Sequence, residues 1–170
     1  MAMLSFDLAS LEFHAVQVEG SLGADDGIWG DDETRPIDAV RVTGRLSSAG
    51  ASRFYFSGTI EGSVATTCRR CLTSVTAPVK EEVHLLFARA DDDEIDDPDV
   101  YVVGDRAREL DLRPSVREQW LLAVPAFVLC RDDCKGLCPH CGADLNLGPC
   151  GCEAVRDDRW DALRDARDPS

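Results

Sequence analysis

The sequence predicts an α+β fold with an antiparallel, curved or barrel-like sheet and one main helix, followed by a cysteine-rich C-terminal segment. Two long segments rich in β-forming residues, 53–67 and 72–88, flank a four-residue turn. Residues 112–124 carry the apolar spacing of an amphipathic helix. Six of the eight cysteines lie within 130–152, among glycines and prolines. That composition is typical of a loop organised by a metal ion rather than by a hydrophobic core.

The elements follow one another in a simple order. Alternating or β-biased segments are predicted as strands over residues 4–18, 38–46, 53–67, 72–88 and 101–103. The Gly- and Asp-rich stretch 20–35 is predicted as a loop, and 47–52 as a turn. The segments 53–67 and 72–88 therefore form a hairpin whose tip carries a CxxC motif.

The helix has recognisable ends and one apolar face. Asp111 is a candidate N-cap, and Pro125 sets the end of the helix. Val116, Trp120 and Val124 recur at intervals of four residues and are expected to face the core. We therefore expect two parts, a β-rich core of residues 1–129 that includes the helix and a cysteine-rich segment with its tail at 130–170. In the tail, Trp160 and Leu163 suggest a further short helix.

The composition indicates a soluble, intracellular chain. Of the 170 residues, 44% are hydrophobic and 29% charged, as in ordinary globular proteins. The first residues carry no basic segment that would start a secretory signal, and the longest apolar run, 120–130, is too short to span a membrane. We expect a cytoplasmic location, no membrane and no small-molecule substrate. Thiols stay reduced in the cytoplasm, so eight cysteines there favour metal binding over disulfides.

The chain is strongly acidic, with a formal net charge of −14. Nucleic-acid binding depends on clustered Lys and Arg, so a naked nucleic acid is a poor default partner, although a local basic patch remains compatible with this charge. The stretch DDDEIDDPD at 91–99 reads as a solvated acidic loop. Its alternative reading is a docking site for a basic protein.

The cysteine spacing predicts two zinc sites. Two thiolates separated by two residues can bind one Zn²⁺ from a tight turn, and CxxC motifs occur at Cys68/Cys71 and Cys138/Cys141. In one division of the eight cysteines, a local site takes Cys138, Cys141, Cys150 and Cys152, and a second site takes Cys68, Cys71, Cys130 and Cys134. A competing division groups Cys130, Cys134, Cys138 and Cys141, and leaves Cys68 and Cys71 with Cys150 and Cys152.

Complete thiolate quartets leave no open coordination position, so both zinc ions are expected to be structural. Iron–sulfur ligation uses the same donors and stays an alternative. A thioredoxin-like dithiol needs its CxxC at the start of a helix, whereas Cys68 and Cys71 lie between predicted strands. No Ser/His/Asp grouping or phosphate loop is visible, and His140, between two ligands, is expected at the surface. We predict no catalytic residues and no enzyme.

The ordered set of motifs from about 40 to 163 resembles the YceD family, the large ribosomal RNA subunit accumulation proteins. The resemblance rests on CRRC at 68–71, the acidic stretch, LDLRPSVREQWLLAVP at 110–125, LCRDDCKGLCPHCGADLN at 129–146, the CxC at 150–152 and DDRWDAL at 157–163. It implies a non-enzymatic role in the accumulation or processing of large-subunit ribosomal RNA, and hence in ribosome biogenesis. It also implies that the C-terminal cysteines form a separable site, which favours pairing Cys68 and Cys71 with Cys130 and Cys134.

The implied partners are a large-subunit ribosomal RNA precursor or a pre-ribosomal particle. Arg69 and Arg70, between two ligands on a rigid tip, are the best candidates for phosphate contact, with Arg131 and Lys135 beside them. These charges could instead offset a negative Zn(Cys)₄ centre. The alternative function is that of an acidic protein-interaction module or a chaperone for a basic ribosomal protein.

Overall fold

The computed structural model describes residues 4–30, 34–50, 52–90, 98–152 and 159. Most of the predicted acidic stretch, residues 91–97, lies outside the described residues, and so does the tail with Trp160 and Leu163. Among the described residues, no helix is long and apolar enough to cross a membrane.

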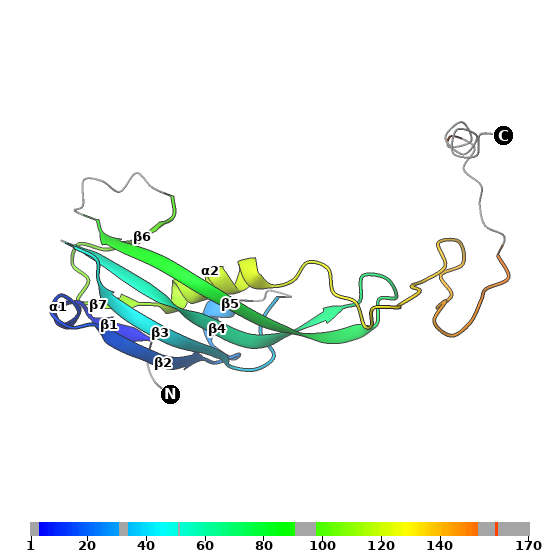
Figure 1. The fold of residues 1–170 in the computed structure, drawn as a ribbon, viewed down its shortest axis with the longest axis horizontal. Helices are drawn as coiled ribbons and strands as arrows, with labels where there is room; N and C mark the ends of the chain where they lie inside the picture. The colour runs from blue at the N-terminus through cyan, green and yellow to red at the C-terminus, as the bar shows by residue number, and fades with distance from the viewer. Residues whose placement is uncertain (1–3, 31–33, 51, 91–97, 153–158, 160–170) are drawn as a thin grey trace, which may run out of the picture.

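The main sheet has five strands in the order β2-β3-β4-β5-β6 (Figure 1). Their bounds are Val16–Leu22, Val40–Ser48, Arg53–Thr67, Ser74–Arg89 and Val100–Val103. Strands β2 to β5 form an antiparallel meander, as alternation and short turns predict. Strand β6 runs parallel to β5, so the prediction of a purely antiparallel sheet was wrong there. Within the described part of the chain, β2 and β6 do not pair with each other, so this sheet is open and not a closed barrel.

A second, two-stranded sheet lies beside the first and pairs β1 (Ser5–Asp7) with β7 (Glu109–Asp111). The predicted strand 4–18 is interrupted here by the short helix α1 (Leu8–Leu11), which corrects that prediction. The Asp7 carboxylate accepts a hydrogen bond from the amide of Ser10 at 2.8 Å and caps the helix. Leu8 and Leu11 are both buried, because a spacing of three residues places them on one face of a helical turn.

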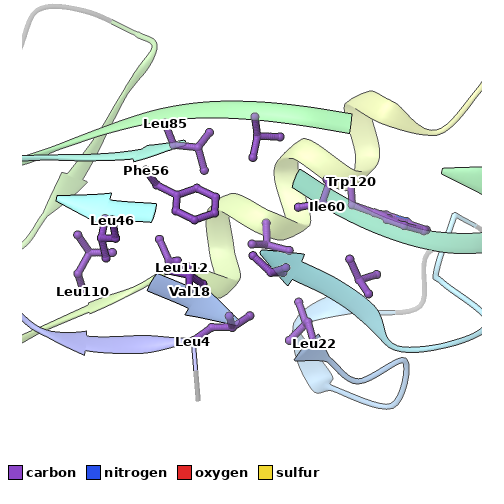
Figure 2. Packing of buried hydrophobic residues seen from close by; sticks show 14 of the residues in the cluster. Leu4, Val18, Leu22, Leu46, Phe56, Ile60, Leu85, Leu110, Leu112 and Trp120 are labelled. Atoms are coloured by element: carbon purple, nitrogen blue, oxygen red, sulfur yellow. The ribbon is translucent and has the colours of Figure 1, made fainter. Parts of the chain in front are cut away.

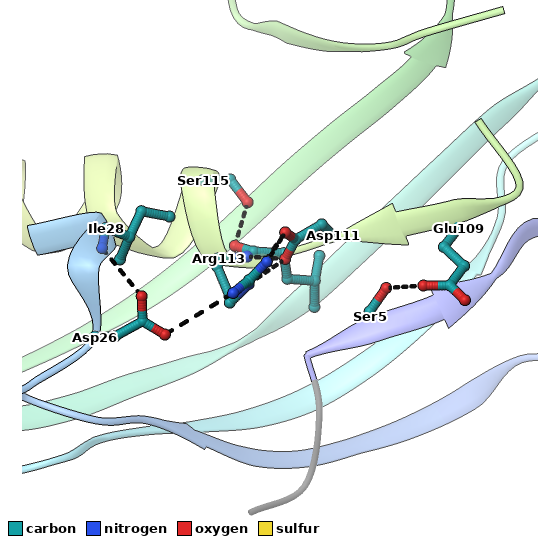
Figure 3. A network of polar contacts seen from close by, with 8 residues as sticks. Ser5, Asp26, Ile28, Glu109, Asp111, Arg113 and Ser115 are labelled. Carbon is teal, nitrogen blue, oxygen red and sulfur yellow. Dashed lines mark hydrogen bonds and ion pairs between the residues drawn. The ribbon is translucent and has the colours of Figure 1, made fainter. Parts of the chain in front are cut away.

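The main helix, α2, spans Arg113–Ala123, one residue inside each predicted end. Asp111 is not its N-cap residue, which corrects that prediction, because Leu112 takes that position without a side-chain bond. The Asp111 carboxylate instead accepts hydrogen bonds from the backbone amide and guanidinium of Arg113, and Asp26 approaches the same guanidinium at 3.9 Å (Figure 3). Burial raises the pKa of Asp111, but the hydrogen bonds to Arg113 outweigh it and leave the pKa below its usual value.

The core lies between the main sheet and α2 (Figure 2). Val116 and Trp120 are fully buried as predicted, whereas Val124 is only partly buried. Sequence analysis missed Trp29, which lies in the stretch predicted as a loop but forms the 3₁₀ turn η1 (Gly27–Trp29). Its ring meets that of Trp120 edge-on, with centroids 6.0 Å apart. The predicted loop 20–35 therefore contains a core residue, and its first residues belong to β2.

Strands β4 and β5 pair without interruption from Arg53↔Ala88 to Thr67↔Ser74. Figure 1 shows this hairpin extending beyond the helix, with the chain that follows α2 meeting its tip. We call residues 125–137 of that chain the strap. The hairpin thereby places the CxxC motif at 68–71 against cysteines that lie about 60 residues later in the sequence.

Candidate metal centres

The eight cysteines lie in two groups of four, and the sulfur atoms within each group are all within 4.8 Å of one another. The hairpin cluster consists of Cys68, Cys71, Cys130 and Cys134. The C-terminal cluster consists of Cys138, Cys141, Cys150 and Cys152. The structure thus brings together the two sets of the first division of the cysteines, and each cluster could hold a metal ion.

The sulfur geometry of the hairpin cluster suits a tetrahedral ion. The Sγ atoms of Cys68 and Cys134 are 3.8 Å apart, and those of Cys71 and Cys130 are 3.6 Å apart. Zn–S bonds of about 2.3 Å place the sulfurs of a tetrahedron about 3.8 Å apart. A disulfide needs about 2.05 Å, so these thiols are free and spaced for a shared ion.

The two CxxC loops share one backbone conformation. In each, the amide of the first cysteine donates to the carbonyl five residues later, at 2.8 Å. The amide of the residue after the second cysteine donates back to the carbonyl of the first cysteine, at 2.9 Å. That residue is Leu72 in one loop and Gly142 in the other, and both have positive φ, 61° and 71°. Each turn therefore brings both sulfurs of its motif to the same side of the chain.

Backbone amides favour the thiolate form of the first cysteine in each motif. Hydrogen bonding from the backbone of Cys71 lowers the pKa of Cys68 to about 6, and the backbone of Cys141 does the same for Cys138. The Thr73 hydroxyl, 3.3 Å from the sulfur of Cys71, lowers the pKa of that thiol as well. These turns supply the anionic sulfur that a metal ion requires.

The last thiols to ionise are those placed against other sulfurs. Contact with Cys134 raises the pKa of Cys130 to about 12, and contact with Cys141 raises the pKa of Cys152 to about 12. Four thiolates repel one another unless a cation offsets their charge. We therefore expect all four thiols of a cluster to be ionised together only when a cation binds.

The hairpin tip and the strap are joined by hydrogen bonds around the hairpin cluster. The carbonyl of Arg70 accepts from the amide of Leu137 at 3.0 Å, and the Arg70 guanidinium donates to the carbonyl of Cys134 at 2.8 Å. Gly136, with φ of 75°, lies against this tip, and a Cβ there would come within 2.9 Å of the Arg70 carbonyl oxygen. Only glycine fits both the backbone conformation and the close approach.

Asn146 joins the C-terminal segment to the hairpin cluster and was missed by sequence analysis. Its amide nitrogen donates to the sulfur of Cys134 at 3.5 Å and to the carboxylate of Asp144 at 2.6 Å. Its side-chain oxygen accepts from the backbone amide of Lys135 and from the Arg131 guanidinium, both at 2.8 Å. No local spacing signals this role, because folding alone brings Asn146 to a cysteine twelve residues away.

The four basic residues predicted for RNA contact are all exposed near the hairpin cluster: Arg69, Arg70, Arg131 and Lys135. The side chains of all three arginines also have intramolecular partners, and that of Arg70 is the Cys134 carbonyl described above. Arg69 donates from Nε to the carbonyl of Ala126 at 2.8 Å, and Arg131 forms an ion pair with Asp133 at 3.3 Å. The arginine contacts therefore hold the strap in place while leaving further N–H groups of each guanidinium for a ligand.

The fold and the sites define a class of protein. It has an open sheet whose longest hairpin carries half of one Cys₄ cluster, and a cysteine-rich C-terminal segment that completes this cluster and contains a second one. The sequence model described as "Large ribosomal RNA subunit accumulation protein YceD" matches residues 56–165. The chain belongs to the YceD family, which confirms the resemblance seen in the sequence.

Relatives from several bacteria agree with this assignment. The uncharacterised protein YlbN of Bacillus subtilis is 33% identical over 116 residues, or 68% of this chain and 66% of YlbN. The uncharacterised proteins Rv2926c of Mycobacterium tuberculosis and ML1660 of Mycobacterium leprae are each 33% identical, over 63% and 61% of this chain. These matches span about half the length of the mycobacterial proteins, 52% and 48%. No solved structure matches this chain.

Proposed function

We propose that this protein is a non-enzymatic ribosome biogenesis factor that promotes the accumulation or processing of large-subunit ribosomal RNA. The observation that carries the proposal is the family match, which covers both cysteine clusters and the basic side chains around the hairpin cluster. Its partner would be a large-subunit ribosomal RNA precursor or a pre-ribosomal particle. The site of action would be the cytoplasm, where thiols stay reduced.

The proposed cofactor is two structural zinc ions, one in each cluster. Each cluster offers four sulfur donors, and among the described residues neither group includes an oxygen or nitrogen donor, which matches the closed type of zinc site. A bound ion would join the hairpin tip to the strap and would supply a cross-link in place of hydrophobic packing. Elemental analysis separates zinc from iron directly.

The hairpin cluster is also the proposed centre of RNA contact. Arg69 and Arg70 are exposed on a tip whose backbone is fixed by hydrogen bonds to the strap. A guanidinium on a rigid turn loses less conformational entropy when it pairs with a phosphate. Arg131 and Lys135 extend the same basic spot on an otherwise acidic protein.

The test is complementation of a bacterial strain that lacks its own YceD-family protein. Wild-type protein should restore the ratio of large- to small-subunit ribosomal RNA, and the double variant Arg69→Ala/Arg70→Ala should not. The matched control is Arg106→Ala/Arg108→Ala, which removes two exposed arginines from the loop before β7. A ratio that does not respond to loss of the protein overturns the proposal. If neutralising the acidic residues of 91–97 abolishes complementation and the arginine variant retains it, the function is that of a carrier for a basic ribosomal protein.

A further inference from the structure

Phe127 is an aromatic residue held in place but left almost entirely in solvent. Its side chain is 86% exposed, although it lies in the strap directly beside the hairpin tip. The Arg69 guanidinium carbon lies 5.8 Å from the centre of the Phe127 ring, a cation–π geometry. The ring and the arginine beside it together offer a flat surface on which a ligand can stack.

The backbone on both sides of the ring is fixed. The Arg69 side chain donates to the carbonyl of Ala126 at 2.8 Å, and the Arg69 amide donates to the carbonyl of Val128 at 2.9 Å. These two hydrogen bonds bracket Phe127 and connect it to the CxxC turn. A ligand that covers the ring therefore meets a surface that is already ordered, which reduces the entropic cost of binding.

A cleft of about 620 Å³ opens beside this surface. Its walls come from the last residues of β4, from the end of α2 and from the start of the strap, and include Thr66, Thr67, Arg69, Leu121, Pro125 and Ala126. Its volume falls within the range of about 300 to 1,000 Å³ that is common for small-ligand sites. The walls combine threonine hydroxyl groups, one guanidinium and apolar side chains, which suit a ribose, a phosphate and a base.

The charge of the chain selects among nucleic-acid ligands. A duplex is held mainly by many phosphate contacts, which a chain of net charge −14 does not favour. A single strand instead gains much of its affinity from bases that stack on aromatic rings and arginine planes. The surface beside the hairpin tip fits a single strand better than a duplex. It has one exposed ring with an arginine against it, a cleft beside the ring, and a second exposed arginine on the same tip.

We propose that Phe127 and Arg69 form a stacking platform for a base of single-stranded RNA, with the neighbouring nucleotide in the adjacent cleft. Arg70, on the same turn, pairs with the phosphate between them. This inference deepens the proposed function, on which it rests, because it names the form of RNA and the residue that binds it.

The test is fluorescence anisotropy of a labelled twelve-nucleotide poly(U) RNA with the metal-loaded, full-length protein. Phe127→Ala should weaken binding about tenfold, whereas Phe127→Trp should retain or improve it. Phe13→Ala is the matched control, because Phe13 is 79% exposed and lies next to α1, away from the tip. A site with two to four phosphate contacts predicts a salt slope of about −1.4 to −2.8.

The outcomes separate this inference from the proposed function. If wild-type protein restores ribosomal RNA accumulation but does not bind poly(U), or binds it equally with Phe127→Ala, the platform is wrong and the function stands. If poly(U) binding depends on Phe127 and the complementation also fails with Phe127→Ala, both are supported. Metal content and thermal unfolding of Phe127→Ala should match those of wild type, because the ring contributes almost nothing to the core.

Discussion

Leu72 and Gly142 occupy the same position in two loops of the same conformation, directly after the second cysteine of each CxxC motif. Both have left-handed backbone angles, with φ of 61° and 71°, and both donate an amide hydrogen to the carbonyl of the first cysteine. Glycine adopts this conformation freely, whereas leucine pays about 1–2 kcal/mol for it. The conformation is therefore required by the turn itself and not by the residue that fills it.

The first prediction concerns the glycines of these loops. Gly142→Ala should reduce metal retention and stability by about 1 kcal/mol, because the alanine must adopt a left-handed conformation in open space. Gly136→Ala should cost more, because its Cβ would also approach the Arg70 carbonyl oxygen at 2.9 Å. Gly151→Ala, which has open space and no left-handed φ, is the control. Competition with a chromogenic chelator measures all three, and an equal loss in each would contradict this account.

The second prediction separates the two clusters. Wild-type protein should contain two metal ions per chain, and both Cys71→Ser and Cys141→Ser should contain one, because the clusters share no ligand. Elemental analysis gives the count, and limited proteolysis of the strap should increase only in Cys71→Ser. Loss of both ions in either variant would show that the eight cysteines form a single unit.

A third prediction tests Asn146, which reaches out of the C-terminal segment to the sulfur of Cys134. Asn146→Ala should weaken metal binding at the hairpin cluster by about 10- to 100-fold, the usual effect of removing a hydrogen bond to a metal ligand. The readout is metal release to a chelator, measured in a Cys141→Ser background so that only the hairpin cluster is complete. Leu147→Ala is the control, because Leu147 is 89% exposed. Identical release rates for the two variants would rule out this role.

The fourth prediction is a pH dependence of stability. The pKa of Asp111 is lowered in the folded state, so its contribution is fully present above the unfolded value of about 3.9 and is lost as the pH falls through the folded value. Asp111→Asn should reduce the loss of stability below about pH 4, measured by urea denaturation at several pH values. Wild type and variant with the same pH profile would show that the pair with Arg113 contributes nothing.

The features that sequence analysis predicted correctly are those encoded by local spacing. Alternation predicts the β4–β5 hairpin, and a four-residue apolar interval that includes Trp120 predicts α2. The features it missed depend on partners distant in sequence. Three such features are the parallel pairing of β6 with β5, the burial of Trp29 against Trp120, and the contact of Asn146 with Cys134. In each, the sequence of one segment does not indicate which segment it will contact. Helix α1 was missed because Leu4, Phe6 and Leu8 alternate as in a strand, and a helix of one turn is too short to show its own period.

The hairpin cluster closes the chain across residues 72–129 at a point outside the main core. The buried side chains there, Cys68, Cys71 and Cys134, form a small cluster of their own that is separate from the one around Trp120. The core is maintained by burial of apolar surface, whose strength varies with temperature, whereas an end held by a metal ion would gain stability with the logarithm of free metal concentration. One end of the molecule should therefore respond to heat and the other to metal supply. Under metal limitation, the tip and strap should separate while the rest of the protein stays folded.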